Sequence, residues 1–372
     1  MRGERSTISF FGLALVAALA AACAPTLSSS SSTFLARLAE GTRAERHGRD
    51  LEAARAYGRA AAAADRRVDR DEALYRQSRS LIDADRARAA LPILDRLAAT
   101  RPVSRRTVRA LYDSALLRLG LGFEGRARAD LERLVRRHPD TGLAARALAT
   151  LLRVLDAGDA PGPNADGDAS PPRADSRGDA LLASLVRDRR VSASELGDNV
   201  LYEQARRREG RRDIAGARRA LSLLVDRYPY PFGQLWDDAL WNLARLDVQS
   251  GRPRDALGHL ERMVAVAERS DFNGSYIRPR MSAAQLRIGE ILRDELHDLD
   301  GALAAFRALP SRFPDSIHRD DAMLAVADIL RTRGDRDEAC ALYRRVGSPD
   351  ARGRAARAAR AAASAHCGAP ER

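Results

Sequence analysis

EALYRQS, residues 72–78, has four close relatives along the chain. They are RALYDSA (109–115), NVLYEQA (199–205), DALWNLA (238–244) and DAMLAVA (321–327). Each stretch carries an apolar residue at its third position and a small residue at its seventh. A spacing of four places both residues on one face of a helix. The recurrence therefore predicts a series of helices, each with one buried face.

A second helix is predicted after each of these stretches. Twelve residues beyond the small residue stands an Ala, and four further on stands a large apolar residue. These pairs are Ala90 and Leu94, Ala127 and Leu131, Ala217 and Leu221, Ala256 and Leu260, and Ala339 and Tyr343. Pro102, Pro139 and Pro229 follow three of the second helices, and proline ends a helix. The pattern predicts antiparallel helix pairs that approach closely at small residues.

This spacing resembles the tetratricopeptide repeat (TPR). Residues 283–314 repeat it with one inserted residue, around Ala302, and a weaker copy lies around Ala53 and Tyr57. The resemblance implies an all-α fold, a TPR-like α-solenoid of antiparallel helix pairs. Along the chain, the step from Ala127 to Ala217 is about twice the other steps, which indicates an interruption.

The interruption predicts a division of the solenoid. Residues 143–155 predict a helix without its expected partner, and residues 156–179, rich in Gly, Pro, Asp and Ser, predict a disordered linker. The expected segments are a signal peptide (1–22), a lipidated Cys with a flexible Ser-rich tether (23–33), an N-terminal TPR block (34–155), the linker (156–179), a C-terminal TPR block (180–350), and a capping helix with tail (351–372).

The N-terminus predicts export. Arg2 and Arg5 precede an uncharged apolar run of about 15 residues, which is shorter than the roughly 20 needed to span a bilayer and is typical of a secretory signal. The sequence LAAAC, ending at Cys23, resembles a bacterial lipobox, although Ala20 stands where Leu is usual. The resemblance implies acylation of Cys23, palmitate included, and Ala24 beside it implies the periplasmic side of the outer membrane. The alternative is an ordinary signal peptide followed by a chance cysteine.

Two further cysteines, Cys340 and Cys367, complete the set of three. In an oxidising compartment pairing is favoured, so we predict a disulfide between them. The alternative is two unpaired thiols, if the capping helix is too long for the sulfurs to meet.

Composition argues against nucleic acid and against catalysis. The formal charge is +12, but the basic residues, all Arg, are spread among Asp and Glu, as on a solvated helix surface. The six His residues have no metal-ligand spacing, and no HExxH, GxSxG or phosphate-binding Gly loop occurs. We therefore predict no catalytic residues, metal, cofactor or small-molecule substrate.

One column of the repeats predicts a protein-binding groove. In the TPR family the first helix of each pair lines the concave groove, and the residue after the apolar anchor points into it. This column reads Tyr75, Tyr112, Tyr202 and Trp241, continued by Leu286 and Leu324; one turn later stand Arg79, Leu116, Arg206 and Arg245. Aromatic and Arg side chains are typical of interface hot spots, and Arg pairs with carboxylates. We expect a peptide segment with apolar and acidic side chains, held most firmly at residues 228–241; the alternative is that the Tyr residues serve packing between repeats.

The repeat junctions indicate a setting. RFPDSIHRDDAML (312–324) and RHPDTGLAARAL (137–148) resemble those of periplasmic envelope proteins, such as the β-barrel assembly lipoprotein and the Tol–Pal-associated repeat protein. The resemblance implies a non-enzymatic scaffold, anchored to the outer membrane through its lipid, whose partners are envelope proteins or peptide segments. Alternatives are an accessory α-superhelical partner of a peptidoglycan-processing enzyme and an adaptor of an export or motility apparatus.

Overall fold

The computed structural model describes residues 30–159, 176–266 and 280–368. All regular structure in these residues is helical, which confirms the predicted fold class. The predicted signal peptide, Cys23 and most of the predicted tether lie outside the described residues. Ser31 caps the first described helix, so the described part of the predicted tether is already the start of that helix. None of the described helices is both long enough and apolar enough to cross a membrane.

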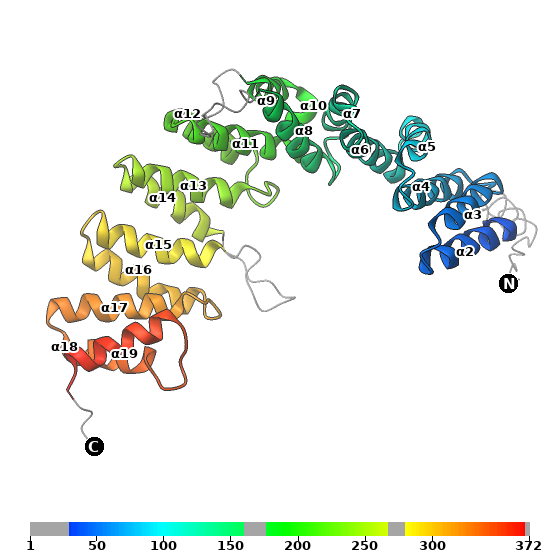
Figure 1. The fold of residues 1–372 in the computed structure, drawn as a ribbon. Helices are drawn as coiled ribbons and strands as arrows, with labels where there is room; N and C mark the ends of the chain where they lie inside the picture. Colours follow the sequence, from blue (N-terminus) through cyan, green and yellow to red (C-terminus); the bar gives the residue numbers. More distant parts are fainter. Residues whose placement is uncertain (1–29, 160–175, 267–279, 369–372) are drawn as a thin grey trace, which may run out of the picture. The chain divides into compact units, whose positions relative to one another are not determined.

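The chain divides into two compact units, residues 1–131 (unit 1) and 132–372 (unit 2). The division falls inside α7 (Glu124–Arg137). The other helices of unit 1, blue to cyan in Figure 1, are α2 (Ser32–Arg46), α3 (Asp50–Ala62), α4 (Arg67–Asp83), α5 (Ala87–Ala99) and α6 (Arg105–Gly120).

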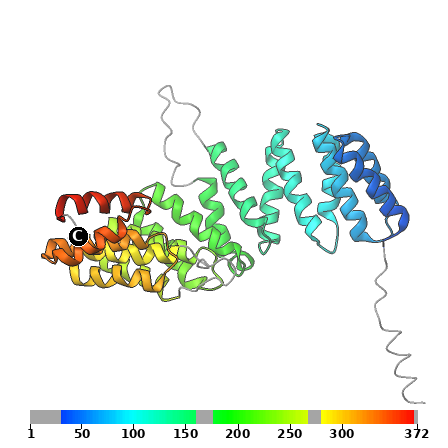
Figure 2. The same cartoon turned by 90° about the horizontal axis from the view of Figure 1, so that it is seen from below.

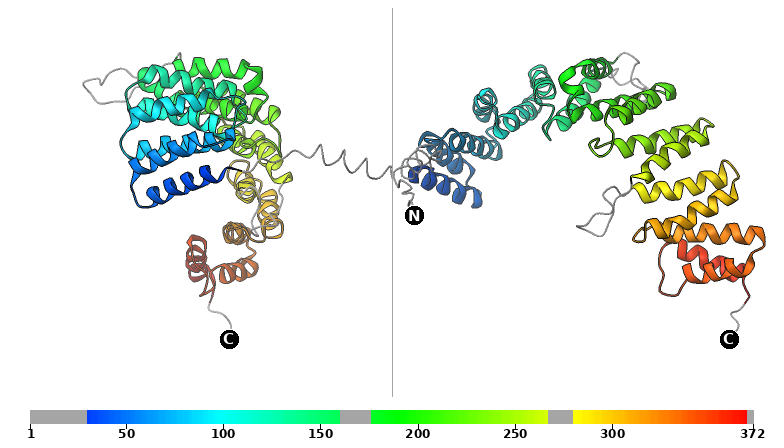
Figure 3. Two further views of the ribbon diagram at one scale, coloured as in Figure 1. Left: turned by 90° about the vertical axis from the view of Figure 1, so that its right-hand side faces the viewer. Right: turned by 180° about the vertical axis from the view of Figure 1, so that it is seen from behind.

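Unit 2 contains the remaining helices. They are α8 (Ala144–Asp159), α9 (Arg177–Arg187), α10 (Arg189–Ser192), α11 (Leu196–Gly210), α12 (Ile214–Arg227), α13 (Trp236–Gln249), α14 (Pro253–Ala265), α15 (Arg280–Asp294), α16 (Leu299–Arg312), α17 (Arg319–Arg333), α18 (Arg336–Val346) and α19 (Arg354–His366). The right-hand view of Figure 3 shows α13 to α18 as successive layers of this unit. One hydrophobic core runs from α11 to α19.

Helix pairs form where the repeat pattern predicts them. Consecutive helices pack together as α2–α3 and α4–α5 in unit 1 and as α11–α12, α13–α14, α15–α16 and α17–α18 in unit 2. The marker residues Ala53, Ala90, Ala127, Ala217, Ala256, Ala302 and Ala339 are all fully buried. Small side chains at these crossings let the helix backbones approach, and the large residues four positions on fill the space between pairs.

Gly41 and Gly289 stand at the position where the other helix pairs have Ala or Ser. In each of these two pairs an aromatic ring lies against the glycine. A Cβ atom built on Gly289 would lie 2.4 Å from Cε1 of Phe306, and one on Gly41 would lie 2.6 Å from Cδ1 of Tyr57. Both rings are fully buried. In these two pairs the ring occupies the volume that a methyl group would take, so the facing position lacks a side chain. The α17–α18 pair, in contrast, accommodates both Ala327 and the buried ring of Tyr343.

The expected linker at 156–179 is partly helical. α8 continues to Asp159 and α9 begins at Arg177, so only residues 160–175 lie outside the described residues. α8 and α9 pack together, and α9 is thus the partner helix that residues 143–155 lacked on sequence grounds. Composition gave no sign of this because a tertiary contact supports the end of α8: Asp156 forms an ion pair with the buried Arg207 of α11.

The chain's last described helix, α19, is the expected cap. It begins at Arg354, three residues later than expected, after Gly353, whose φ of 103° favours glycine. Ala355, Ala356 and Ala359 form its buried face against α17 and α18. Figure 2 shows α19 in red beside these helices. Arg residues on its other side give the end of the stack a polar surface, as repeat arrays require.

Candidate interaction surface

Tyr75, the first member of the predicted groove column, serves packing. It is 9% exposed, and its hydroxyl donates a hydrogen bond of 2.8 Å to Oδ2 of Asp113 on α6. The Arg106 guanidinium lies 4.3 Å from the centre of its ring. Burial and the Asp113 charge raise the pKa of the Tyr75 hydroxyl. Tyr75 thus joins successive first helices instead of facing a partner, as the alternative interpretation held.

The other predicted groove residues of unit 1 are held by fewer contacts than Tyr75. Tyr112 is half-buried on α6, and Leu116, one turn on, is 39% exposed. Arg79 lies on α4 and pairs over 3.5 Å with Asp83 of the same helix.

Tyr202 on α11 also ties neighbouring helices together. Its hydroxyl accepts a hydrogen bond of 3.0 Å from Nδ2 of Asn242 on α13. Burial first, and then the charge of Asp238, raises the pKa of this hydroxyl. The next residue in register, Arg206, is exposed and pairs over 2.8 Å with Glu203 of its own helix.

Trp241 on α13, another column residue, lines a pocket. The pocket has a volume of about 510 Å³ and its apolar wall comes from Trp241, Leu260 and Leu286. Arg245, Arg287, Glu290 and His318 supply polar groups, and Ala244 and Ala283 complete the lining. The Arg280 guanidinium lies 5.9 Å from the centre of the Trp241 ring and pairs over 2.7 Å with Asp238.

A second pocket adjoins the first, since Leu286 and Glu290 line both. Its volume is about 350 Å³. The α17 residues Asp321, Leu324, Ala325 and Asp328 line it, together with Arg293 and Phe306 and, from α19, Arg354, Ala355 and Ala358. The three column residues Trp241, Leu286 and Leu324 therefore lie along one open surface, which we call the α13–α17 surface.

The sequence predicts that Arg79, Arg206 and Arg245 bind carboxylates of a partner. In the structure, each of the three already lies beside a carboxylate of this chain. Arg245 pairs over 2.8 Å with Glu209 of α11, and Arg206 and Arg79 are paired within their own helices. A guanidinium whose charge is already matched by a neighbouring carboxylate gains less from an acidic partner. The Arg side chains of the column are therefore less available to an acidic partner than the sequence predicted.

The aromatic stretch 228–241 is also more structural than expected. Trp236 is 4% exposed and packs against Tyr230 with ring centres 5.8 Å apart. Tyr228 donates a hydrogen bond of 2.7 Å to the carbonyl of Ser192. Phe232, in contrast, is 85% exposed. Of the aromatic residues in this stretch, Trp241 alone lines either of the two pockets described above.

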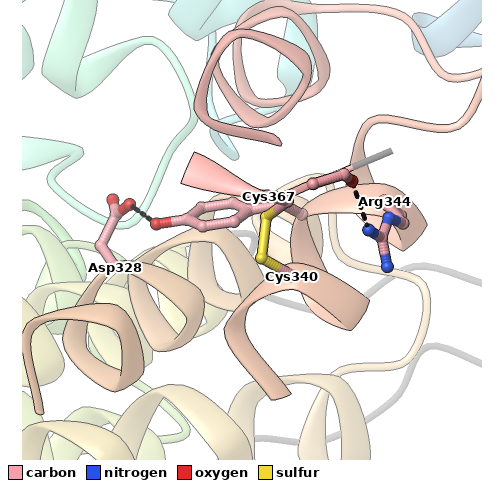
Figure 4. Close-up of a disulfide and its surroundings, with 6 residues drawn as sticks. Asp328, Cys340, Arg344 and Cys367 are labelled. Atoms are coloured by element: carbon pink, nitrogen blue, oxygen red, sulfur yellow. Dashed lines mark hydrogen bonds between the residues drawn. A yellow bond between two sulfur atoms is a disulfide. The ribbon is translucent and has the colours of Figure 1, made fainter. Parts of the chain in front are cut away.

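Cys340 of α18 and Cys367, which follows α19, are joined by a disulfide in the structure (Figure 4). Their Cα atoms are 5.7 Å apart. Beside the bond, Arg344 donates to the carbonyl of Gly368 over 3.0 Å, and the Tyr343 hydroxyl donates to Oδ1 of Asp328 over 2.6 Å. The cap is thus fixed to α18 at the end remote from the second pocket.

A buried ion cluster in unit 2 has no counterpart in the sequence prediction. Asp247 of α13 is fully buried, and its carboxylate lies 2.6 Å from Nε of Arg218, 3.3 Å from Nη2 of Arg252 and 3.2 Å from Nε2 of His259. Burial lowers the pKa of His259 more than the Asp247 charge raises it. The cluster joins α12, α13 and α14 within the core, so we assign it to stability. The described residues contain no group of His, Cys, Asp and Glu that could hold a metal ion.

Several residues of the α13–α17 surface were not predicted. Glu290 and Asp328 stand four positions after Leu286 and Leu324, in the same register as Arg206 and Arg245. Applying the same four-residue spacing to the α15–α16 and α17–α18 pairs would have predicted both residues. Asp321 and Arg354 have no such signal, because the fold of the cap brings them to the pocket.

Comparison with known proteins identifies one repeat of the predicted kind. The tetratricopeptide repeat family model matches residues 283–316, which cover most of α15 and α16. A TPR protein structure from Parabacteroides merdae is 12% identical, with a TM-score of 0.34, over 78% of this chain and 98% of that chain. The C-terminal part of a TPR repeat-containing protein from Cytophaga hutchinsonii is 11% identical, with a TM-score of 0.41, over 76% of this chain and 97% of that chain. No curated protein matches this chain. The α15–α16 pair matches the tetratricopeptide repeat, and the regular structure of the described residues is all helical.

Proposed function

We propose that this protein is a non-enzymatic scaffold that holds a segment of a partner protein against the α13–α17 surface. The observation that carries the proposal is the position of Trp241, Leu286 and Leu324. They occupy the same place on three successive first helices and line two adjoining pockets. Apolar side chains left partly open in a row suit the side chains of a bound peptide, and stacked repeats form extended binding surfaces of this kind.

We further propose that the scaffold works at the periplasmic side of the outer membrane, among envelope proteins. This part rests on the sequence: a cationic start, an apolar run and the lipobox-like LAAAC that ends at Cys23. Acyl chains would hold the protein at the membrane, and more than one chain makes such anchoring stable.

The test is capture of a partner by the wild type and by a variant with an altered surface. The full-length protein is cross-linked in its own envelope, purified, and its partners are identified by mass spectrometry. Trp241→Ala combined with Leu286→Ala should lower recovery of the partner at least about tenfold, because truncating a central aromatic anchor costs about 2 kcal/mol or more. Circular dichroism checks that the variant remains helical.

Phe232→Ala is the matched control. It also removes a large aromatic side chain from unit 2, but Phe232 is 85% exposed and lines neither pocket. The control should capture the partner as the wild type does. Undiminished capture by a folded double variant would refute the assignment of the binding surface.

A further inference from the structure

The α13–α17 surface changes the sign of its charge along its length. One turn after the column residues, Arg206 and Arg245 stand on α11 and α13, whereas Glu290 and Asp328 stand on α15 and α17. The first pocket has two guanidinium groups, Arg245 and Arg287, against the carboxylate of Glu290. The second pocket has three carboxylates against two guanidinium groups. A peptide on this surface therefore meets different chemistry at its two ends.

The guanidinium groups of the first pocket are already paired. Arg245 lies 2.8 Å from Glu209, and Arg287 lies 2.8 Å from Glu290. What this pocket offers to a partner is its apolar wall of Trp241, Leu260 and Leu286. A large aliphatic or aromatic side chain fits a cavity of about 510 Å³ with such a wall.

The second pocket keeps negative charge in place. Asp328 is half-buried, and the Tyr343 hydroxyl donates to it over 2.6 Å. Burial, followed by this carboxylate, raises the pKa of Tyr343 to about 12, so the hydroxyl remains a donor. Asp321 is half-buried too, and it forms no ion pair with any part of the chain that the structure describes.

The cations at the second pocket compete weakly for these carboxylates. Arg293 pairs over 2.7 Å with Asp294 and lies over the Phe306 ring at 5.7 Å. Arg354 is exposed in the first turn of α19, where water screens its charge. The carboxylates of Asp321 and Asp328 are thus left to receive a cation from outside.

We infer that the α13–α17 surface binds a peptide segment that places a large apolar side chain against Trp241 and Leu286 and an Arg or Lys side chain against Asp321 and Asp328. The inference rests on the proposed function and specifies its partner. Because the two pockets share Leu286 and Glu290, the two side chains need only be a few positions apart. An Arg side chain suits the second site best, since its fork can meet carboxylates with paired hydrogen bonds.

The test uses short acetylated peptides and the full-length protein. Each fluorescently labelled peptide carries one Phe and one Arg at varied spacing in an Ala and Ser background, and a matched series carries Glu in place of Arg. Binding is measured by fluorescence anisotropy. The best Arg peptide should bind about tenfold more tightly than its Glu counterpart, because contact with two carboxylates exceeds the value of one exposed ion pair. Added salt should reduce this preference.

Asp321→Asn with Asp328→Asn should abolish the preference for Arg. Asn at 328 keeps an oxygen that can accept from Tyr343, and Asp321→Asn alone, which removes no ion pair, should reduce the preference by about threefold. The matched control is Asp320→Asn, which removes the same charge from the same helix turn but lines neither pocket. The control should keep the full preference.

Three results would overturn the inference. They are equal or tighter binding of the Glu series, an Arg preference that survives in the folded double Asn variant, and no binding of either series at about 1 mM. The scaffold proposal is judged separately, by partner capture with the Trp241 and Leu286 double variant. Loss of capture there, together with any of these results, would leave the scaffold standing and remove only its preference for a basic segment.

Discussion

Gly289→Ala should destabilise the α15–α16 pair, although Ala normally favours a helix. The new Cβ atom would lie 2.4, 2.6 and 2.7 Å from three ring atoms of Phe306, whereas carbon atoms in contact are about 3.5–4.0 Å apart. The ring is fully buried, and the only relief the structure offers near it is a shift toward the second pocket, which Phe306 also lines. Overpacking of this kind costs about 1–3 kcal/mol, and the helix preference of Ala returns about 1 kcal/mol. We expect a net loss of up to about 2 kcal/mol.

A second substitution should reverse much of this loss. Phe306→Leu alone should cost about 1 kcal/mol through lost packing. Combined with Gly289→Ala it recreates the Ala–Leu facing pair of the α13–α14 repeat, where Ala244 and Leu260 are both buried. The double variant should therefore be more stable than the sum of the two single effects predicts, by about 1–3 kcal/mol.

Hydrogen exchange of the α15 and α16 amides is the suitable assay, because stacked repeats need not unfold as one unit. Gly258→Ala is the matched control: Gly258 lies in α14, and a Cβ atom there would meet nothing within 4 Å. The control should gain about 1 kcal/mol. A gain of the same size from Gly289→Ala, or strictly additive effects in the double variant, would refute the steric argument.

Three further outcomes are expected. Cys23→Ser should release the protein from membranes or leave it uncleaved, and an equally soluble wild type would contradict the lipid anchor. Cys340 and Cys367 should become alkylated only after reduction, as measured by mass, and reduction should cost roughly 3–4 kcal/mol of stability in the chain-entropy model. Because burial lowers the pKa of His259 in the folded state, the unfolded state takes up its proton first as the pH falls below about 6.5. The urea midpoint should fall over that range, and His259→Gln should flatten the change.

The helix pairs were predictable because their packing repeats. Ala at each crossing and a large apolar residue four positions on are buried in every copy, so the same spacing recurs in sequence. The α8–α9 pair escaped prediction because its connection is long and polar. The end of α8, as far as Asp159, is supported by a tertiary contact, the ion pair of Asp156 with Arg207. A repeated sequence spacing indicates contacts that recur from one helix pair to the next. It does not indicate a contact that occurs once, such as the Asp156–Arg207 ion pair.

The residues that follow the apolar anchor could not by themselves predict the α13–α17 surface. The residue that faces each of them from the next repeat also had to be considered. Tyr75 bonds to Asp113 and Tyr202 to Asn242, and both partners occupy the fifth position of the next stretch in line. In both cases the Tyr hydroxyl is hydrogen-bonded to an Asp or Asn at the fifth position of the next stretch.

Trp241 differs at that second position. The fifth residue of the following stretch is Arg287, whose guanidinium has only donors and pairs with Glu290 instead. The indole N–H and the guanidinium cannot bond to each other, so these two side chains are not joined by a hydrogen bond, and both line the pocket of about 510 Å³. At these three positions, the residue opposite the column aromatic in the next repeat distinguishes a Tyr that is hydrogen-bonded to its neighbour from the Trp that lines a pocket. Two sequence positions are therefore needed: the residue after the apolar anchor and the fifth residue of the next stretch. Neither position alone is sufficient.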